Sequence, residues 1–237
     1  MQTIADRILR EYSFYRDGSP ELRNGVLEHV RLFDTQDLKD GHLFRVGDRH
    51  DSICLVGQGR IRVYVSGPSG RGVLLYNVRA GEICPINMRM VLAGTVALAN
   101  ADTSAEFVSV VLNRSGLRDL SARFGEFHQF VQQSVADRFE EIILRISDIT
   151  TRSVDHRLIA LLLEEFDNST FENPTVEMTN DDLALAIGTA REVVNRKLQD
   201  LERQGALRLG RGRIWLEDRG ALQSMMKPKG SVGVGSR

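Results

Sequence analysis

Cysteine is scarce in this sequence, and its scarcity argues against a secreted scaffold held together by disulfides. The 237 residues include only two cysteines, Cys54 and Cys84. Small secreted domains that lack a sufficient core use many more. The first residues of the chain also lack the apolar segment of a secretory signal peptide. We therefore expect the reducing environment of the cytoplasm.

Long apolar runs are missing as well. The most apolar stretch, residues 91–101, contains Gly94 and Asn100, and it is far shorter than the roughly 20 residues that a membrane helix requires. We expect no membrane partner. The net charge of the chain is only −1, so it does not indicate a nucleic-acid partner.

Sequence motifs of catalysis and metal binding are also absent. The chain contains no P-loop, no His-Glu-x-x-His spacing and no Ser/His/Asp set in a recognisable frame. Asp181 and Asp182 form a pair of neighbouring carboxylates, but they stand in a helix-capping pattern. The chain is therefore not expected to be an enzyme, and the sequence predicts no metal site of its own side chains.

The first half of the chain has the texture of short antiparallel strands. Between residues 30 and 114, β-branched runs alternate with turns rich in Gly, Asp and Asn. Many short strands with no helices between them favour a sandwich or barrel over a doubly wound nucleotide fold. Residues 1–29 are expected to form an N-terminal arm with short helices. The predicted strands cover residues 42–46, 52–56, 60–66, 73–78 and 106–112.

Residues 115–149 predict one long helix, since they contain no proline and carry a periodic apolar stripe. Such a stripe packs either on the chain's own domain or in a parallel seam with a second copy. We favour the seam, because the helix extends beyond anything that a small β-domain could cover. The predicted seam residues are Phe127, Val131, Val135, Ile142, Ile146 and Ile149.

Two short helices joined by a glycine turn are predicted over residues 179–204. Thr179 and Asp182 have the spacing of a capping box and open a helix over residues 180–187. Gly188 supplies a tight turn. Thr189 and Glu192 repeat the capping pattern before a second helix over residues 190–204. This arrangement is typical of a helix-turn-helix.

The second helix of such a motif enters the major groove of DNA with its N-terminal residues leading. Its exposed face is predicted to carry Arg191, Glu192, Asn195 and Arg196. An arginine can donate to guanine O6 and N7, and a glutamate can accept from cytosine N4. The positions predicted to face the core are Val193, Val194, Leu198 and Leu201.

The local charge agrees with contact to DNA. Residues 189–213 hold seven basic and three acidic side chains, a net charge of +4, which can neutralise phosphates. Residues 205–209 and 213–216 flank Gly210-Arg211-Gly212, and this pattern predicts a β-hairpin wing whose tip contacts the DNA backbone. The candidates for backbone contacts are Thr179, Thr189, Asn195, Lys197, Arg211 and Arg213.

The chain resembles the CRP/FNR family over nearly its whole length. The match is carried by Gly188-Thr189-Ala190-Arg191-Glu192-Val193-Val194-Asn195-Arg196 and by the pattern Gly47-Asp48, Leu55-Val56, Gly59 to Tyr64 and Gly81-Glu82. The resemblance implies an α+β fold with an N-terminal antiparallel β-roll or jelly roll over residues 30–114. A long dimerisation helix over 115–149, a winged helix-turn-helix over 150–226 and a disordered tail over 227–237 would follow. It further implies base reading by Arg191, Glu192 and Arg196 on a palindromic TGTGA-like site, with RNA polymerase as a partner.

The resemblance also implies an effector site on the β-roll. Cyclic-nucleotide-binding members follow Gly-Glu with an Arg-Ser or Arg-Thr pair that holds the cyclic phosphate, whereas Gly81-Glu82 precedes Ile83-Cys84-Pro85 and Arg89 comes too early. Without this clamp a charged ligand would retain unpaired groups, so cyclic AMP is not the expected effector. The candidate pocket residues are Gly81, Glu82, Cys84, Arg89, Ile142 and Ile143.

Other effectors stay open. Two cysteines cannot hold the iron–sulfur cluster of FNR-like sensors. Haem would suit an apolar pocket beside Ile142-Ile143, and Cys84-Pro85 resembles a haem-responsive dipeptide. Cys84 is either a redox-sensing thiol or an inert buried residue, and some family members need no ligand. The candidate axial ligands for haem are His29, His42, His50 and His128.

The sequence thus predicts a homodimeric, sequence-specific transcription regulator that is switched by a signal at the N-terminal β-roll. The alternative is a haem or redox sensor of the same fold whose DNA binding is weak or lost. The sequence predicts no particular cofactor.

Overall fold

The computed structural model describes residues 2–38, 41–67, 72–171 and 173–226. Antiparallel sheets occupy the N-terminal half and a helix-turn-helix occupies the C-terminal half, which confirms the predicted α+β class. The chain divides into two compact units, residues 1–66 with 74–145 and residues 67–73 with 146–237. The tail predicted over residues 227–237 lies outside the described part.

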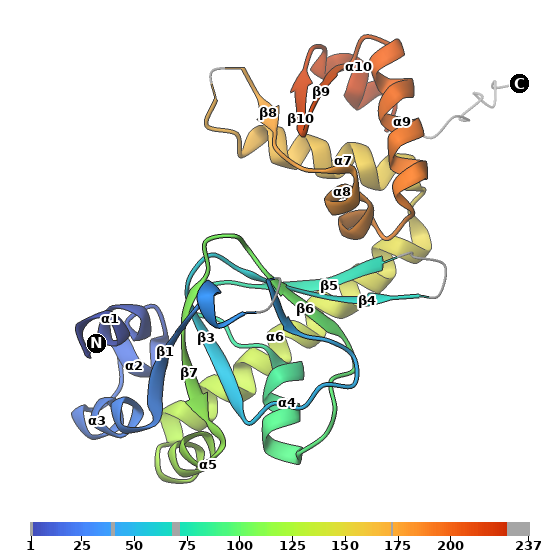
Figure 1. Ribbon diagram of the computed structural model, residues 1–237. Helices are drawn as coiled ribbons and strands as arrows, with labels where there is room; N and C mark the ends of the chain where they lie inside the picture. Colours follow the sequence, from blue (N-terminus) through green and yellow to red (C-terminus); the bar gives the residue numbers. More distant parts are fainter. Residues whose placement is uncertain (1, 39–40, 68–71, 172, 227–237) are drawn as a thin grey trace, which may run out of the picture. The chain divides into compact units, whose positions relative to one another are not determined.

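Two antiparallel sheets form the framework of the first unit (Figure 1). One sheet has the order β1-β7-β3 and the other has the order β2-β6-β4-β5. The pairing register places Cys54 opposite Val111 in the first sheet and Val63 opposite Ala101 in the second. The strands are β1 Val30–Asp34, β2 His42–Phe44, β3 Ser52–Gln58, β4 Ile61–Ser66, β5 Gly72–Val78, β6 Asn100–Thr103 and β7 Val108–Asn113.

The core of this β-roll follows from the alternation of side chains along the strands. On β4, Ile61 and Val63 are buried while Arg62 and Tyr64 between them are half-buried, because successive side chains point to opposite faces of a strand. The inward positions join one apolar cluster that also contains both cysteines, Cys54 and Cys84. β1 and β6 were not among the predicted strands.

The N-terminal residues belong to the first unit rather than to a separate arm. The predicted short helices are present as α1 Gln2–Leu9, α2 Ser13–Arg16 and α3 Pro20–His29. Leu9, Tyr12 and Tyr15 are buried in the core. The Tyr12 hydroxyl donates to the carbonyls of Val56 at 3.1 Å and Glu82 at 3.2 Å, and this ties the segment to the β-roll.

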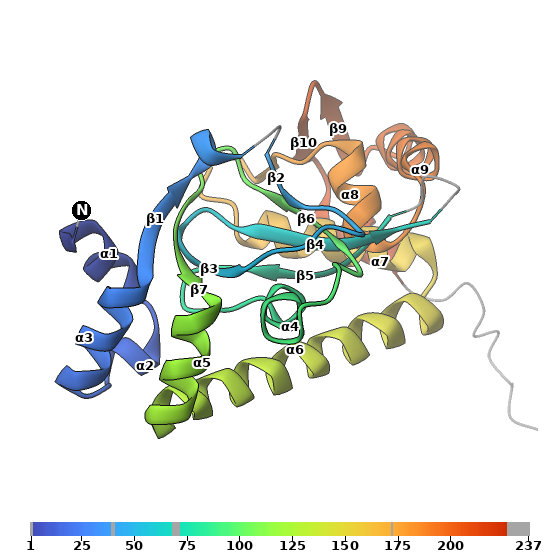
Figure 2. The same cartoon turned by 60° about the horizontal axis from the view of Figure 1, so that its bottom comes forward.

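The helix predicted over residues 115–149 is two helices. α5 covers Arg114–Arg123 and α6 covers Gly125–Thr151. The chain is extended at Phe124, with φ −123° and ψ 110°, and the Phe124 side chain packs against the core. A further helix, α4 Pro85–Ala93, was not anticipated from the sequence. In Figure 2, α6 is one uninterrupted helix that runs along the β-roll.

The second unit is a small helical domain with a three-stranded sheet in the order β8-β10-β9. Its core contains buried side chains from α7 to α10. The elements of this unit are α7 Val154–Asp167, β8 Thr175–Val176, α8 Asn180–Ile187, α9 Arg191–Arg203, β9 Leu207–Gly210, β10 Arg213–Leu216 and α10 Arg219–Ser224.

In both units, no helix within the described ranges is long and apolar enough to cross a membrane.

Candidate nucleic-acid interface

The helix-turn-helix begins as predicted. The Thr179 hydroxyl accepts from the backbone N–H of Asp182 at 3.1 Å, and the Asp182 carboxylate accepts from the backbone N–H of Thr179 at 3.3 Å. This reciprocal pair is the capping box of α8. The helix ends at Gly188, whose φ of 66° lies in the left-handed region that favours glycine. A Cβ there would also come within 3.1 Å of Ile149.

The second predicted capping box is wrong. The N-cap of α9 is Ala190, and no side chain caps this end. Thr189 is buried, and its hydroxyl has no hydrogen-bond partner among the described residues. Its backbone N–H instead donates to the Ala184 carbonyl at 2.9 Å and closes the end of α8. The Thr189 side chain therefore cannot serve as the predicted contact to the DNA backbone.

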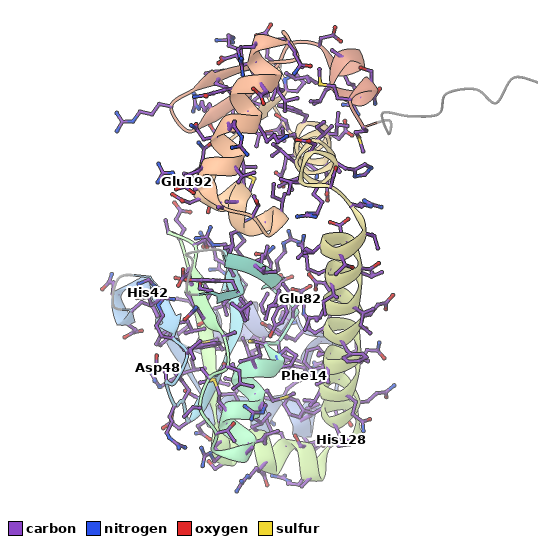
Figure 3. The ribbon with its side chains drawn as sticks, turned by 90° about the vertical axis from the view of Figure 1, so that its right-hand side faces the viewer. Phe14, His42, Asp48, Glu82, His128 and Glu192 are labelled. Atoms are coloured by element: carbon purple, nitrogen blue, oxygen red, sulfur yellow. The ribbon has the colours of Figure 1, made fainter. Side chains whose placement is uncertain are left out.

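The predicted base readers share one exposed face of α9. Arg191, Glu192 and Arg196 are all exposed, and Figure 3 labels Glu192 on this helix. The opposite face is buried through Val194, Leu198 and Leu201. Because a helix advances about 100° per residue, one face of α9 packs on the core and the other is free for a ligand. Val193, which was predicted to be buried, is half-buried.

Most of the basic side chains on this surface are paired with acids. Four of the five acids involved lie outside residues 189–213, so they cancel the +4 that the stretch carries by itself. Arg196 and Arg211 have no ion-pair or hydrogen-bond partner within the described residues and are the cations most available to phosphates. The pairs are Arg191–Asp181 at 3.1 Å, Lys197–Asp155 at 2.7 Å, Arg208–Glu217 at 2.9 Å, Arg213–Glu177 at 2.8 Å and Arg203–Asp200.

The other residues predicted to contact the DNA backbone lie in different surroundings. Lys197 is half-buried and turned toward Asp155 of α7, which takes it away from the exposed face of α9. Thr179 is exposed, and its hydroxyl is engaged in the cap of α8. The Asn195 side chain accepts from the Asn180 amide at 3.2 Å. Arg213 lies on the wing, where its guanidinium meets Glu177.

The wing is a hairpin of β9 and β10 with Arg211 and Gly212 at its turn. Gly210 lies against the ring of Trp215, and a Cβ at this position would come within 2.6 Å of two ring carbons. The Arg208 guanidinium covers the same ring at 4.1 Å from its centroid. This packing of a cation on an aromatic face stiffens the base of the hairpin and leaves Arg211 exposed at its tip.

Sequence reasoning missed Arg157, a buried arginine behind the helix-turn-helix. Its guanidinium donates to the carbonyls of Ile187 at 2.8 Å and Ile149 at 3.1 Å, and also to that of Arg152. Ile187 ends α8, and the other two carbonyls lie at the end of α6. Within the described residues no carboxylate pairs with Arg157, so the negative ends of two helices stabilise its charge. Only the spatial meeting of these helix ends identifies it.

The apolar stripe of α6 divides between two faces, which corrects part of the predicted seam. Phe127 is buried in one core cluster of the chain, and Val131 packs against the same cluster. Ile142 packs against the second cluster, which contains both cysteines. Ile149 is half-buried near Gly188. Of the predicted set, Val135 and Ile146 are exposed. The exposed apolar face of α6 consists of Val135, Phe139, Ile143 and Ile146.

A pocket of 580 Å³ lies between the N-terminal helices, the Gly81-Glu82 turn and α6. Figure 3 shows Phe14 and Glu82 on the side of the β-roll that faces α6. Arg138 of α6 pairs with Glu82 at 2.5 Å and also with Glu141. Burial alone would lower the pKa of Arg138, but the two carboxylates outweigh it and the pKa is raised. Arg138 also lies over the Tyr76 ring, 5.3 Å from its centroid.

Gly81 and Glu82 are the only predicted effector residues among those that line this pocket. Cys84 is buried, and burial raises the pKa of its thiol, which opposes the thiolate that a redox sensor requires. Arg89 is exposed and donates to the Val96 carbonyl at 3.4 Å. Ile142 packs in the β-roll core, and Ile143 is exposed on the free face of α6.

The four candidate haem histidines are dispersed. None of them lines the pocket, and neither does any described cysteine or methionine. His42 contacts Asp102 at 2.9 Å, and His29 approaches Asp119 at 4.0 Å. His50 meets the Phe44 ring, and His128 lies exposed on α6. The described residues contain no group of three metal-ligating side chains.

The fold and this surface define a two-unit protein with an N-terminal β-roll and a C-terminal winged helix-turn-helix. Residues 156–225 match the family of the Crp-like helix-turn-helix domain. A putative CRP/FNR-family regulator from Eubacterium rectale, with 18% sequence identity, superposes with a TM-score of 0.77 over 92% of this chain and 99% of that chain. This likeness concerns the fold.

Two curated relatives are transcription regulators. The CRP-like cAMP-activated global transcriptional regulator of Mycobacterium tuberculosis is 23% identical over 219 residues, which is 90% of this chain and 96% of that protein. Transcriptional regulator SdrP of Thermus thermophilus is 29% identical over 106 residues, which is 43% of this chain and 50% of that protein. Residues 156–225 thus match a Crp-like helix-turn-helix domain, and the chain is similar over most of its length to a curated transcription regulator of the CRP type.

Proposed function

We propose that the chain reads a palindromic TGTGA-like site in double-stranded DNA as a homodimer. The observation that carries this proposal is the common exposed face of Arg191, Glu192 and Arg196 on α9, opposite a buried face. These side-chain types match guanine and cytosine edges in the major groove. Arg211 at the wing tip, which has no ion-pair partner in the described part of the chain, supplies a contact to the DNA backbone. RNA polymerase is the expected second partner, and the cytoplasm is the expected location.

A second copy of the chain is the occupant that best fits the exposed face of α6. Val135, Phe139, Ile143 and Ile146 follow one another at spacings of four, four and three residues, which places them on one face of the helix, as packing against a second helix requires. Phe139 is 66% exposed and Ile146 is 57% exposed. Two-fold symmetry would present two reading helices about one DNA turn apart, roughly 34 Å, as a palindrome requires.

The proposed switch is a signal at the β-roll that changes how the α6 helices pack. The Glu82–Arg138 ion pair supports it, because it joins the Gly81-Glu82 turn to α6 beside a pocket of 580 Å³. Arg138 is the only cation among the pocket residues, and two carboxylates already engage it. This arrangement disfavours a cyclic phosphate as the ligand, although the relative from Mycobacterium tuberculosis is named as cAMP-activated.

The base-reading proposal is tested by substituting the readers on a duplex selected from a random pool. Arg191→Ala and Arg196→Ala should each cost about 1–3 kcal/mol of binding free energy and relax base choice at one position in each half-site. Fluorescence anisotropy on a set of single-base variants measures both effects. Arg211→Ala is the control, since a phosphate contact should weaken all sequences alike and flatten the salt dependence. Equal weakening on every sequence for Arg191→Ala would contradict base reading.

The haem alternative predicts a coloured protein. The pocket residues include no histidine, cysteine or methionine, and haem iron needs such an axial ligand or a tyrosine. We therefore expect no Soret band in the absorption spectrum after purification or after addition of hemin. A band that disappears on substitution of one of the four candidate histidines would restore the haem sensor.

A further inference from the structure

Asp181 holds the guanidinium of Arg191 by a single bond. Arg191 Nη1 donates to Asp181 Oδ2 at 3.1 Å. A guanidinium carries five N–H donors in a planar fork, so this bond leaves the edge formed by Nε and Nη2 free. That edge presents two parallel donors, which is the geometry that guanine O6 and N7 accept.

The capping box of α8 does not use Asp181. The cap of α8 is completed by its neighbour Asp182, which forms the reciprocal bonds with Thr179. The side chains of Arg191 and Asp181 are 62% and 65% exposed, and such exposed pairs add little to stability. An acid beside a surface that must approach phosphates also opposes binding in general. The exposed pair with Arg191 therefore leaves Asp181 available for a role in reading DNA.

A second bond joins the same two helices one turn further along. The Asn180 amide donates to the Asn195 side chain at 3.2 Å, next to the Asp181–Arg191 pair. The residues of both links line a pocket of 370 Å³ together with Gly210, Gly212 and Arg213 of the wing. The first turn of α8 thus borders the exposed face of α9 where the predicted readers stand.

We propose that Asp181 is a positioning residue that sets the base discrimination of Arg191. Its carboxylate holds one end of the guanidinium and directs the free edge toward a guanine. The same carboxylate repels phosphate oxygens, so Arg191 is kept from pairing with the backbone of unrelated sequences. This inference rests on the proposed function, since it concerns how the same surface discriminates between bases.

The test compares three duplexes: the selected palindrome, its variant at the position where Arg191→Ala abolishes preference, and an unrelated sequence. Asp181→Ala should reduce the affinity ratio between palindrome and variant by roughly threefold to tenfold, as expected for loss of one charge-assisted bond. Affinity for the unrelated duplex should stay equal or rise. The fluorescence of Trp215 should confirm that the second unit stays folded, because the Thr179–Asp182 cap remains.

Asp200→Ala is the matched control. It removes the same charge from another exposed pair of α9, that with Arg203, and should leave the ratio unchanged. In an Arg191→Ala background, Asp181→Ala should change the ratio no further. An unchanged ratio in the single variant, or an equal change in both backgrounds, overturns the inference while the proposed function stands. A wild-type protein without sequence preference overturns both.

Discussion

Replacement of Phe139 by aspartate should convert the protein to a monomer and lower its affinity for a palindromic duplex by roughly 100-fold or more. Phe139 lies at the centre of the exposed apolar face of α6. In a seam between two copies its ring would be buried, so a carboxylate there would lose its hydration without gaining a partner. Sedimentation velocity measures the mass, and anisotropy measures the affinity for whole and half sites.

Leu144→Asp is the control for this experiment. Leu144 is equally apolar and 62% exposed, but five residues from Phe139 correspond to a rotation of about 140° around the helix. The control should remain dimeric and bind normally. A Phe139→Asp protein that sediments as a dimer would refute the seam, and dissociation of both variants would place the interface on a wider surface of α6.

Arg157→Met should destabilise the second unit by roughly 2–4 kcal/mol. Methionine keeps much of the volume of the side chain but removes its hydrogen bonds to the carbonyls of Ile149, Arg152 and Ile187. These carbonyls stand at helix ends where few other donors are available. Urea unfolding followed by fluorescence reports on this unit alone, because Trp215 of β10 is the only tryptophan of the chain.

Arg152→Ala provides the comparison for Arg157→Met. Arg152 pairs with Asp148 at 3.2 Å on the surface of α6, where its side chain is 53% exposed, and such pairs contribute about 0.2–1 kcal/mol. Its backbone carbonyl, which accepts from Arg157, is unaffected. Equal unfolding midpoints for Arg157→Met and the wild type would show that water replaces the lost donors without cost.

The helix-turn-helix could be predicted closely, because its signals are local. A cap at Thr179, a glycine at 188 and an apolar spacing on α9 each act within a few residues. The same local pattern failed at Thr189, where the backbone closes α8 and the side chain turns inward. The tight turn after α8 uses the backbone N–H of Thr189 and buries its side chain, so this residue cannot cap α9 as the sequence pattern predicted.

The apolar stripe of α6 could not be assigned from its periodicity. A helix that packs on its own domain and also bears an exposed apolar face has two stripes, and the sequence merges them into one. Phe127 belongs to the inner face and Phe139 to the outer face. Only the position of the β-roll beside the helix separates them.

The sequence by itself determined the order of the units, the helix α9 with its three candidate base-reading side chains, and the hairpin wing. Tertiary structure alone decided which cations remain free of ion pairs. Asp155 and Glu177 are distant along the chain from Lys197 and Arg213 but adjacent to them in space. Asp181 and Glu217 are also brought against Arg191 and Arg208 by the fold. It likewise decided that Arg138 meets Glu82 and that Arg157 meets two helix ends. Electrostatic interactions depend on distance in space, which periodicity and spacing along a chain do not encode.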